Sequence, residues 1–589
     1  MYFSHTVRIP EDHVVRVRNR DTVYVYWEKS REYIGEKKYT APKRVCIGKE
    51  DPSAPGFMYP NGNFMLCFPG EEMPEEKSAF ERSSALKIGM YLVIRRIAES
   101  MGIKGILTDV FGSKDAGIIL DLAAYSIVTE GNAAQYYPDY AYSHPLFTED
   151  MVMYSDSTVS RFLQDMSLEK RKVFLDGWNS GMDHRRKIYI SYDSTNKNSQ
   201  AGELELVEFG KPKDDKGLPI FGYSIAYDST NSIPLFYEEY PGSIVDISQL
   251  EFMMDKARAY DYRNATFILD RGYFSKGNIR YMEEKGYGFI LMVKGLHDLT
   301  SSLIDQRMGT FEKSRNCYIR RFSLYGTTVK SRIYSDDTKD SYFHIFHSSW
   351  RESHERSQLE KKLDAMADSM DKHIGTSFRF SGAYETYYDL TYAPDGTFLM
   401  YREKSDVVEK ELRHCGYFTI VTSAEMDAEK AITIYKSRDE NEKLFRGDKS
   451  YLGDRSMRVT TDERMSSRIF IEFIALIIRC RFYTYLRDKF KDEGSRPNWS
   501  TVPAAQRELE KIEITRCYDG IYRMDHAVTK KQKEILSALG ISGDDVKADA
   551  KEIGKVLSSK TICVYDSLEL PRKITKIPQK DRINPGALN

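Results

Sequence analysis

The chain has 589 residues, a charged fraction of 30% and a formal net charge of −1 at pH 7. This length exceeds what one hydrophobic core usually supports, so the composition predicts several domains in an ordinary globular protein. The near-neutral charge argues against a histone-like electrostatic binder but leaves room for local basic patches.

Cysteine usage and hydropathy exclude further classes. The seven cysteines are scattered singly without a CxxC pair, which predicts free thiols in a reducing compartment and no structural zinc. The longest apolar run, residues 469–478, is too short to cross a bilayer, and the N-terminus lacks a signal-peptide pattern. We therefore expect a cytoplasmic protein with no membrane partner.

The first third of the chain divides into two regions. Residues 1–75 combine an alternating segment, Thr22–Trp27, with scattered prolines, which predicts short strands and turns. Residues 76–182 have helical periodicity, and we expect them to bind a DNA end, although a plain helical bundle would show the same pattern. No helix-turn-helix signature decides between the two. The expected helices are 86–101, 116–128 and 157–178.

Residues 183–295 predict a mixed α/β sheet, because strands are followed by alternating helices and strands. Two strands carry an aspartate at their expected ends, Asp193 and Asp270, and the C-terminal strand edge is where α/β sheets place their sites. The expected strands are 187–196, 204–210, 220–228, 265–270 and 288–295. The expected helices are 247–260 and 276–285.

The rest of the chain alternates again between strands and helices. Residues 296–424 predict an inserted, β-rich subdomain that includes one charged helix, 352–372. Residues 425–492 predict a return to the core through two long helices, 426–445 and 463–490. Residues 493–589 predict a C-terminal helical region, with a short helix at 530–539 and a basic tail.

The helix expected at 426–445 carries an unusual mixture of charges. Tyr435, Arg438, Glu442 and Lys449 follow the spacing i, i+3, i+7 and i+14. On an α-helix these four positions fall within roughly a 60° arc. A carboxylate can hold a metal, while Arg and Lys hold phosphates, so this face suits a phosphodiester substrate. The alternative is a solvated helix face, where the same residue types are common.

Asp193, Asp270 and Glu442 together predict a metal site. Three unpaired carboxylates at one place repel each other and would tend to take up protons. Divalent cations such as Mg²⁺ remove that repulsion, and two ions about 4 Å apart can stabilise an in-line displacement at phosphorus. For each aspartate alone, the alternative is a turn or helix-capping residue.

Two similar strings are expected to play no part in this site. Asp228 belongs to a second YDSTN string, identical to residues 192–196, but it falls in a turn between two strands, so Asp193 is favoured. Residues 401–404 spell YREK within a strand, where neighbouring side chains point to opposite faces and cannot converge.

The motifs ISYDST, FILDRGYFS and Y-x2-R-x3-E-x6-K, in this order, resemble the DDE transposases of bacterial insertion sequences. The last motif is the signature of the hairpin-forming cut-and-paste branch. Similar stretches extend over residues 80–540, including FTIVTS before the signature and MSSRIFIEFIALII after it.

The resemblance implies an RNase H-like catalytic core, interrupted by a β-rich insertion after its fifth strand. It implies that Asp193, Asp270 and Glu442 bind two Mg²⁺ or Mn²⁺ ions, and that Tyr435 and Arg438, with Lys449, contact the terminal phosphates. The implied partners are double-stranded DNA, as transposon inverted-repeat ends and target, and a second copy of the chain on paired ends. The implied location is the nucleoid-associated bacterial cytoplasm.

One further residue and two other functions stay open. Some members of the family hold a flipped base with an aromatic side chain from the insertion, and Trp350 lies in the corresponding region, although it could also be a buried core residue. The chain could instead be an inactive or domesticated DNA-binding derivative, or a two-metal nuclease without transposition. With so little net charge, DNA binding would rely on cations near the signature helix and on the basic tail. These cations are Lys436, Lys443, Arg446, Arg455, Arg458, Arg464 and Arg468.

Overall fold

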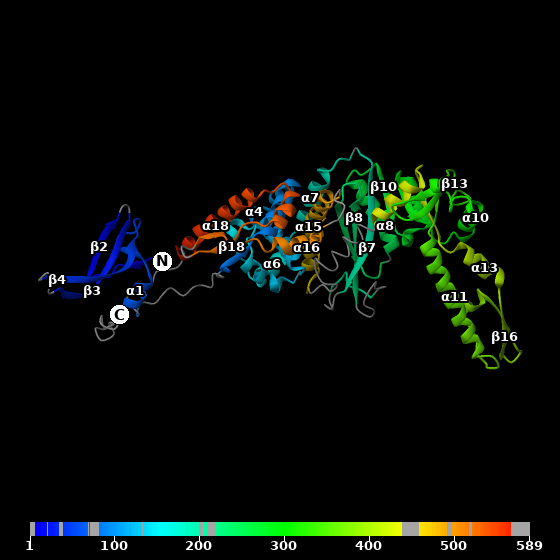
Figure 1. Ribbon diagram of the computed structural model, residues 1–589, viewed down its shortest axis with the longest axis horizontal. Coiled ribbons are helices and arrows are strands. Elements are labelled where there is room, and N and C mark those ends of the chain that lie inside the picture. The colour runs from blue at the N-terminus through cyan, green and yellow to red at the C-terminus, as the bar shows by residue number, and fades with distance from the viewer. Residues whose placement is uncertain are drawn as a thin grey trace. The chain divides into compact units, whose positions relative to one another are not determined.

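The computed structural model divides the chain into two compact units (Figure 1). One comprises Met1–Lys170 with Ser467–Asn589, and the other comprises Arg171–Ser466. Among the described residues, none of the helices has the length and apolar character needed to span a bilayer. The structure describes residues 6–19, 22–34, 39–68, 70, 82–131, 133–184, 186–198, 204–209, 219–244, 246–438, 459–491, 497–517 and 521–566.

The first unit begins with an antiparallel five-stranded sheet in the order β1-β5-β4-β3-β2. The helix α1, Gly62–Cys67, begins at Asn61, whose side chain accepts hydrogen bonds from two backbone amides of the first turn. Val25, Ile47 and Phe64 are fully or almost fully buried in the core of this sheet and helix. The strands are β1 (Val7–Arg8), β2 (Val14–Asn19), β3 (Thr22–Ile34), β4 (Tyr39–Glu50) and β5 (Phe57–Pro60).

Helices follow, with several differences from the expectation. The segment expected as a helix over 86–101 begins as a strand at Ala85–Lys87 and is helical only from Gly89. The helices at Ile103–Phe111 and Tyr137–Ser143 were not predicted. The single helix expected over 157–178 is two helices, because the chain leaves helical geometry at Met166. Ser167 then accepts a hydrogen bond from the backbone amide of Lys170 and so begins the next helix. The helices are α2 (Gly89–Ser100), α3 (Ile103–Phe111), α4 (Ser113–Thr129), α5 (Tyr137–Ser143), α6 (Asp156–Asp165) and α7 (Leu168–Ser180).

The C-terminal part contains one long helix that the sequence reading missed. This helix, α18 (Gly543–Asp566), begins where Ser542 and Asp545 exchange hydrogen bonds, which is a recognisable capping signal. The basic tail beyond it lies outside the described residues. The remaining elements are α15 (Asp462–Lys489), α16 (Val502–Leu509), α17 (Lys530–Ser537) and a small sheet of β6 (Ala85–Lys87), β18 (Glu513–Arg516) and β19 (Tyr522–Met524).

The second unit is built on a nine-stranded mixed sheet, which confirms the predicted α/β class. Its order is β12-β13-β14-β17-β11-β10-β7-β8-β9. β7 and β10 are parallel, as are β10 and β11, while the other neighbours are antiparallel. The strands are β7 (Ile188–Asn198), β8 (Ile220–Asp228), β9 (Ile233–Pro241), β10 (Ala265–Leu269), β11 (Gly288–Met292), β12 (Tyr318–Ile319), β13 (Leu324–Ser331), β14 (Ser341–His347) and β17 (Tyr417–Thr422).

Most helices of this unit occur where the sequence predicts them, but one strand does not. The segment 204–210, expected as a strand, turns at Leu204–Val207 and contributes a single bridge between Glu208 and Ile220. The helices are α8 (Asp246–Ala259), α9 (Lys276–Lys285), α10 (His297–Arg307), α11 (Ser349–Asp371), α12 (Gly382–Glu385), α13 (Ser405–His414) and one over 428–438.

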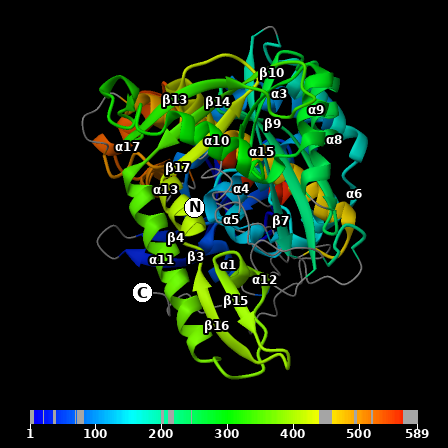
Figure 2. The same ribbon diagram turned by 90° about the vertical axis from the view of Figure 1, so that its right-hand side faces the viewer.

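The region 296–424 is not a separate β structure throughout. Four of its strands, β12, β13, β14 and β17, extend the sheet that begins at β7, because β17 pairs directly with β11. Only β15 (Tyr388–Tyr392) and β16 (Phe398–Glu403) form a hairpin of their own, which packs beside α11 (Figure 2). Residues 401–403 lie in β16, so the YREK string is in a strand as expected.

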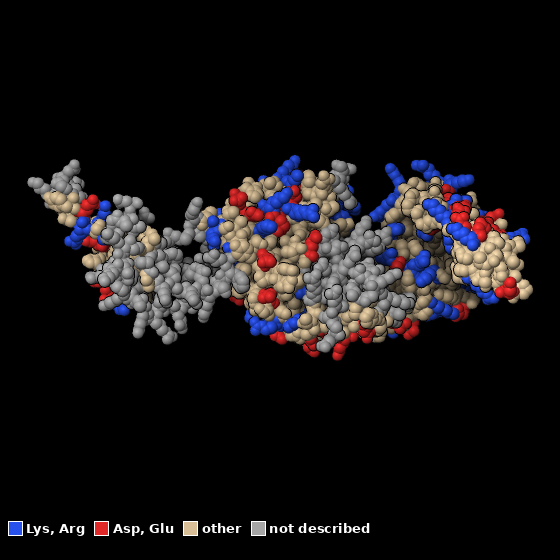
Figure 3. All heavy atoms as spheres, turned by 90° about the horizontal axis from the view of Figure 1, so that it is seen from below, with Lys and Arg blue, Asp and Glu red and all other residues tan. Residues whose placement is uncertain are grey.

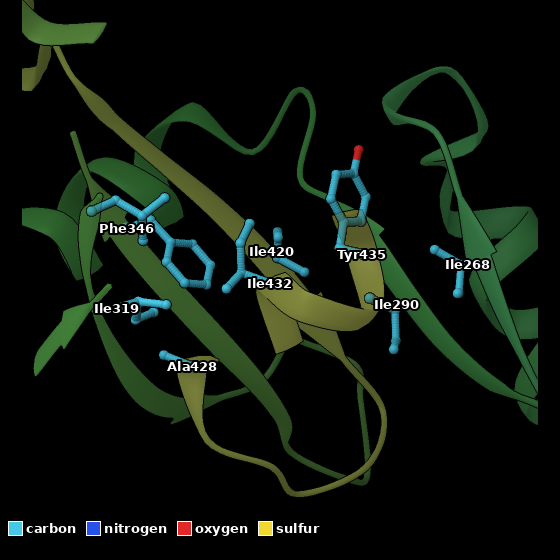
Figure 4. Packing of buried hydrophobic residues seen from close by; sticks show 9 residues of the cluster. Ile268, Ile290, Ile319, Phe346, Ile420, Ala428, Ile432 and Tyr435 are labelled. Carbon is cyan, nitrogen blue, oxygen red and sulfur yellow. The ribbon is translucent and has the colours of Figure 1, made fainter. Parts of the chain in front are cut away.

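The helix over 428–438 packs on the sheet through an apolar stripe (Figure 4). Ala428, Ile432 and Tyr435, at positions i, i+4 and i+7, share one buried cluster with Ile268 of β10 and Ile290 of β11. Ile432, Ile268 and Ile290 are fully buried. This packing fixes the first part of the signature segment over the two central parallel strands.

A histidine in the same sheet is buried as a neutral group. The Thr422 hydroxyl donates to the Ala424 carbonyl, so its oxygen accepts from Nε2 of His344 at 3.0 Å. The Thr328 hydroxyl lies 2.9 Å from Nδ1 and can donate to it. Burial lowers the pKa of His344 to about 4. Both ring nitrogens are therefore satisfied without a charge.

His344 should make folding sensitive to acid. Because its folded pKa lies below the unfolded value, the unfolded chain takes up a proton first as the pH falls through 6.5. We expect the free energy of unfolding to fall by up to about 3 kcal/mol between pH 6.5 and about 4, and to stay level above 6.5 on this account. Urea unfolding of the wild type and of His344→Gln at several pH values measures this change in the free energy of unfolding. The variant should lose this pH dependence, and the exposed-site control His354→Gln should keep it; an equal slope in all three proteins would contradict the assignment.

Candidate catalytic site

Two of the expected carboxylate residues occupy matching positions on neighbouring parallel strands. The ladder between β10 and β7 ends with Ile268 opposite Ser191. Asp270 and Asp193 each lie two residues further along, and adjacent strands in a sheet are about 4.8 Å apart. The register therefore brings both residues to the carboxyl edge of β10, although the side chain of Asp193 is outside what the structure describes.

The expectation that the strand ends near Asp193 is wrong. β7 continues to Asn198, because it pairs with β8 along its whole length, with Asp193 opposite Ile225. Only its pairing with β10 stops before Asp193. Asp193 thus lies inside a strand yet just beyond the end of the parallel ladder.

The carboxylate of Asp270 is not used for a turn. Asp270 precedes the short 3-10 helix η4, Arg271–Tyr273, but its side chain makes no capping hydrogen bond there. Asp228 shows the contrast, because its carboxylate accepts from the backbone amides of Thr230 at 2.8 Å and Asn231 at 3.2 Å. Turn chemistry therefore explains Asp228, as expected, and does not explain Asp270.

The side chain of Asp270 faces a cation from the signature segment. Nη1 of Arg438 lies 2.8 Å from Oδ1 of Asp270, with side-chain exposures of 16% and 49%. The guanidinium carbon of Arg438 also lies 5.4 Å from the ring centre of Tyr435. The sequence indicates phosphate contact for Arg438 and does not reveal this pair. The available signal for this pair was the opposite charge of two residues, one at a strand end and one on the signature helix.

Tyr435 has a structural role as well as its expected contact role. Its ring is buried with 3% exposure, and its phenol oxygen points away from Ile432 in Figure 4. Removing the ring would open a cavity over β10 and β11, whereas removing the hydroxyl alone would not. The contribution of the ring to stability can therefore be separated from the role of the hydroxyl at this residue.

Two of the predicted site residues, Glu442 and Lys449, lie outside the described residues. Among the side chains that the structure does describe, no three His, Cys, Asp or Glu lie together as a metal-binding group. The expected triad therefore stays a prediction, with its first two members placed in register by the backbone and its third given by sequence spacing alone.

Trp350 is not a buried core residue. It lies in the first turn of α11 with 79% exposure, and its ring stacks parallel to that of His354, with centroids 5.6 Å apart. Ser348 accepts a hydrogen bond from the backbone amide of Arg351 and so begins this helix. An exposed flat ring anchored at a helix start is available for stacking on another planar group.

The cations expected to bind DNA are not all at the surface. Arg468 is 5% exposed, and it lines a small cavity together with Glu472 in the first unit. Burial lowers its pKa, while the charge of Glu472 opposes that effect. Arg468 is therefore a buried charge rather than a phosphate contact. On the face in Figure 3, Lys and Arg atoms form separate groups interspersed with Asp and Glu.

Comparisons with known proteins give one family match. The model of the transposase DDE domain matches residues 179–478, just over half of the chain. A search of curated proteins finds no match.

Two solved structures are similar at a low level. The cryo-EM structure of a piggyBac transposase synaptic complex with hairpin DNA is 8% identical with a TM-score of 0.31, and the match covers 83% of this chain and 79% of that one. The crystal structure of a pre-cleavage Mos1 transpososome is 12% identical with a TM-score of 0.13, covering 23% of this chain and 51% of that one. Both TM-scores are too low to carry a structural argument.

Substitutions of Tyr435 should show that its ring, and not its hydroxyl, stabilises the fold. Tyr435→Ala should lower the free energy of unfolding by about 3–5 kcal/mol, because it removes a buried aromatic ring. Tyr435→Phe keeps the ring and should change stability by less than about 1 kcal/mol. Urea unfolding of both variants tests this. Equal stability of the alanine variant and the wild type would contradict the observed docking of the helix.

Proposed function

The chain belongs to the transposase DDE domain family, and we propose that it is an active DNA transposase that cleaves and joins strands at the ends of its own insertion sequence. The observation that carries this proposal is the meeting of three sequence motifs at one sheet edge. Asp193 and Asp270 share a register position there, and Arg438 of the signature helix reaches Asp270.

We infer that the half-sheet β9-β8-β7-β10-β11 is an RNase H-like core. In its support, three antiparallel strands are followed by two that are parallel to the first, with helices α8 and α9 in the connections. In such sheets the site lies at the carboxyl ends of the parallel strands. The strands β17, β14, β13 and β12 then continue the same sheet beyond the fifth core strand.

The residues fit a site for divalent cations. Asp193, Asp270 and Glu442 offer only hard carboxylate oxygens, the donors that Mg²⁺ and Mn²⁺ prefer. The Asp270 carboxylate already faces a positive group, the Arg438 guanidinium, and is not used for capping. Two such ions would polarise the scissile phosphate and lower the pKa of an attacking water.

The side chains of this chain would bind and orient the DNA end. Arg438 can pass from Asp270 to a phosphate oxygen, since a guanidinium forms the same paired contacts with either group. We propose that Tyr435 and Lys449 hold the neighbouring phosphates. The oxygen of water then attacks phosphorus and the bond to the 3′-oxygen breaks. The released 3′-hydroxyl attacks a phosphorus of the opposite strand, which closes a hairpin and breaks the bond from that phosphorus to the 3′-oxygen of the flanking DNA. Water opens the hairpin at the same phosphorus and frees the 3′-hydroxyl again. This hydroxyl then attacks a phosphorus of the target DNA, whose bond to its own 3′-oxygen breaks.

The proposal includes the assembly and setting of the reaction. Two copies of the chain would act as a homodimer on paired inverted-repeat ends, in the nucleoid-associated cytoplasm of a bacterium. We propose that Trp350 stacks on a base flipped out during hairpin formation. Its 79% exposure and its place at the beginning of α11 support this role.

Substitution of the triad should abolish chemistry but not binding. Asp193→Asn, Asp270→Asn and Glu442→Gln each remove a carboxylate charge, and we expect Mg²⁺-dependent cleavage of end-containing DNA to fall at least 1,000-fold, about 4 kcal/mol of transition-state stabilisation. Gel-shift binding to the same DNA should persist. The matched control Asp389→Asn, in the exposed hairpin strand β15, should cleave normally.

The outcomes distinguish the other functions. Full activity in any one triad variant would remove that residue from the site. Binding to the ends without any metal-dependent cleavage by the wild type would indicate an inactive derivative. Cleavage without strand joining, and without preference for an inverted repeat, would indicate a two-metal nuclease.

Trp350→Ala should affect one step only. Because the ring is exposed, its removal leaves no cavity, and stability should change by less than about 0.5 kcal/mol. Loss of base stacking, about 1–3 kcal/mol, should reduce hairpin formation on pre-nicked DNA roughly 5- to 150-fold, while first-strand nicking is unchanged. Trp350→Phe should restore most of the hairpin yield. Unchanged hairpin yield in the alanine variant would contradict the role.

A further inference from the structure

The N-terminal sheet carries a projecting two-stranded extension. β2 pairs with β3 only as far as Trp27, and β5 pairs with β4 only from Gly48 onward. Beyond Glu28 and Arg44, the two strands pair only with each other among the described residues. We call residues 28–34 and 39–44 the β3–β4 ribbon. In Figure 1 it extends past the end of β2.

A bulge in the β3–β4 ribbon places two arginines around one carboxylate. Glu28 is opposite Arg44, but the next pair is Ser30 with Lys43, so Lys29 is an extra residue. Such a bulge shifts the alternation of side chains and brings Arg31 to the face of Glu28 and Arg44. Oε1 of Glu28 lies 2.6 Å from Nε of Arg31, and Oε2 lies 3.7 Å from Nε of Arg44.

This arrangement holds two guanidiniums ready for an anion. Both contacts use Nε, so the terminal amino groups are not spent on Glu28. The side chain of Glu28 is 12% exposed, whereas those of Arg31 and Arg44 are 71% and 39% exposed. One carboxylate between two arginines leaves a net positive charge, and the fixed side chains lose less freedom when they bind.

An exposed aromatic ring lies on the same face. Tyr33 follows Arg31 by two residues, so strand alternation places both on one face, and Tyr33 is 66% exposed. The opposite face is closed by an ion pair of 2.9 Å between Lys43 and Glu32. The ribbon therefore has one face suited to an anionic, partly apolar surface and one face that is internally neutralised.

We propose that the β3–β4 ribbon docks in a groove of duplex DNA, with Arg31 and Arg44 on phosphates and Tyr33 against the sugar backbone. A two-stranded ribbon fits the major groove, which is about 12 Å wide, and seven residues extend about 23 Å along it. Arg31 and Arg44 suit this role because both contact the same carboxylate, that of Glu28, which orients them before DNA binds. The inference rests on the proposed function, since it takes DNA as the partner.

The test compares salt dependence of binding in the full chain. The double variant Arg31→Gln/Arg44→Gln and the wild type are titrated against a duplex taken from the DNA that flanks the coding region, at several NaCl concentrations. Loss of two phosphate contacts should reduce the slope of log K against log[NaCl] by about 1.8 and weaken binding at low salt. Arg31→Lys/Arg44→Lys should keep most of the slope, because the charges remain.

Two controls make the outcome specific. Lys43→Gln changes a cation of the other face and should leave the slope within about 0.5 of the wild type. Asp270→Asn should bind with the wild-type slope but fail to cleave, so a failure of catalysis is distinguished from a failure of the ribbon. The proposal is overturned if the double variant has the same slope as Lys43→Gln. It is also overturned if the double variant binds DNA as the wild type does and loses only its binding to vesicles of anionic lipid. Near-identical thermal unfolding of the wild type and the arginine variants of the ribbon is expected, since both arginines are exposed.

Discussion

The parallel pairing of β7 with β10 is the constraint on which the candidate site depends. Its register places Ile268 opposite Ser191, and hence Asp270 at the level of Asp193. A slip of one residue would move one aspartate to the other face of the sheet and separate the pair. The buried, apolar β10 resists such a slip, because all five of its residues are buried. Hydrophobic burial thus sets the geometry of a polar site.

The same apolar surface also positions the cation beside Asp270. Ile432 and Tyr435 pack on the central strands, and Arg438 follows Tyr435 by one turn, so burial of the ring carries the guanidinium to the strand edge. Where the Asp270 carboxylate has no cation, its neighbour Asp193 would repel it. The Arg438 contact therefore reduces the cost of holding negative charge at this edge before any other partner arrives.

Sequence reasoning succeeded where a local pattern decides the structure and failed where distant packing does. The bounds of α9 were predicted correctly, because Ser275 caps its start and Gly286 adopts a left-handed conformation at its end. The sequence could not predict that the strands of 296–424 extend the sheet of β7. That outcome depends on the pairing of β17 with β11, which has no local sequence signal. The prediction that Arg468 binds DNA was wrong for the same reason. Its place in the sequence shows that it is a cation, but its burial beside Glu472 depends on tertiary packing. The Asp270–Arg438 pair joins segments about 170 residues apart and has no local signal.

The arm formed by α11 and the β15–β16 hairpin is joined to the sheet at a single junction. Changes in the arm can therefore occur separately from changes in the sheet. This arm leaves after β14 and returns at β17, where His347 is opposite Tyr417 and the Ser348 amide donates to the Gly416 carbonyl. Gly416 has a φ of +88°, and a Cβ there would lie 2.7 Å from Glu352, so glycine closes the junction. In topological terms the whole arm is one enlarged hairpin loop. Because loop-closure entropy grows slowly with length, such a loop can lengthen, shorten or be exchanged without altering the ladder beneath it. The arm can thus change in evolution while the sheet that carries the candidate site stays the same.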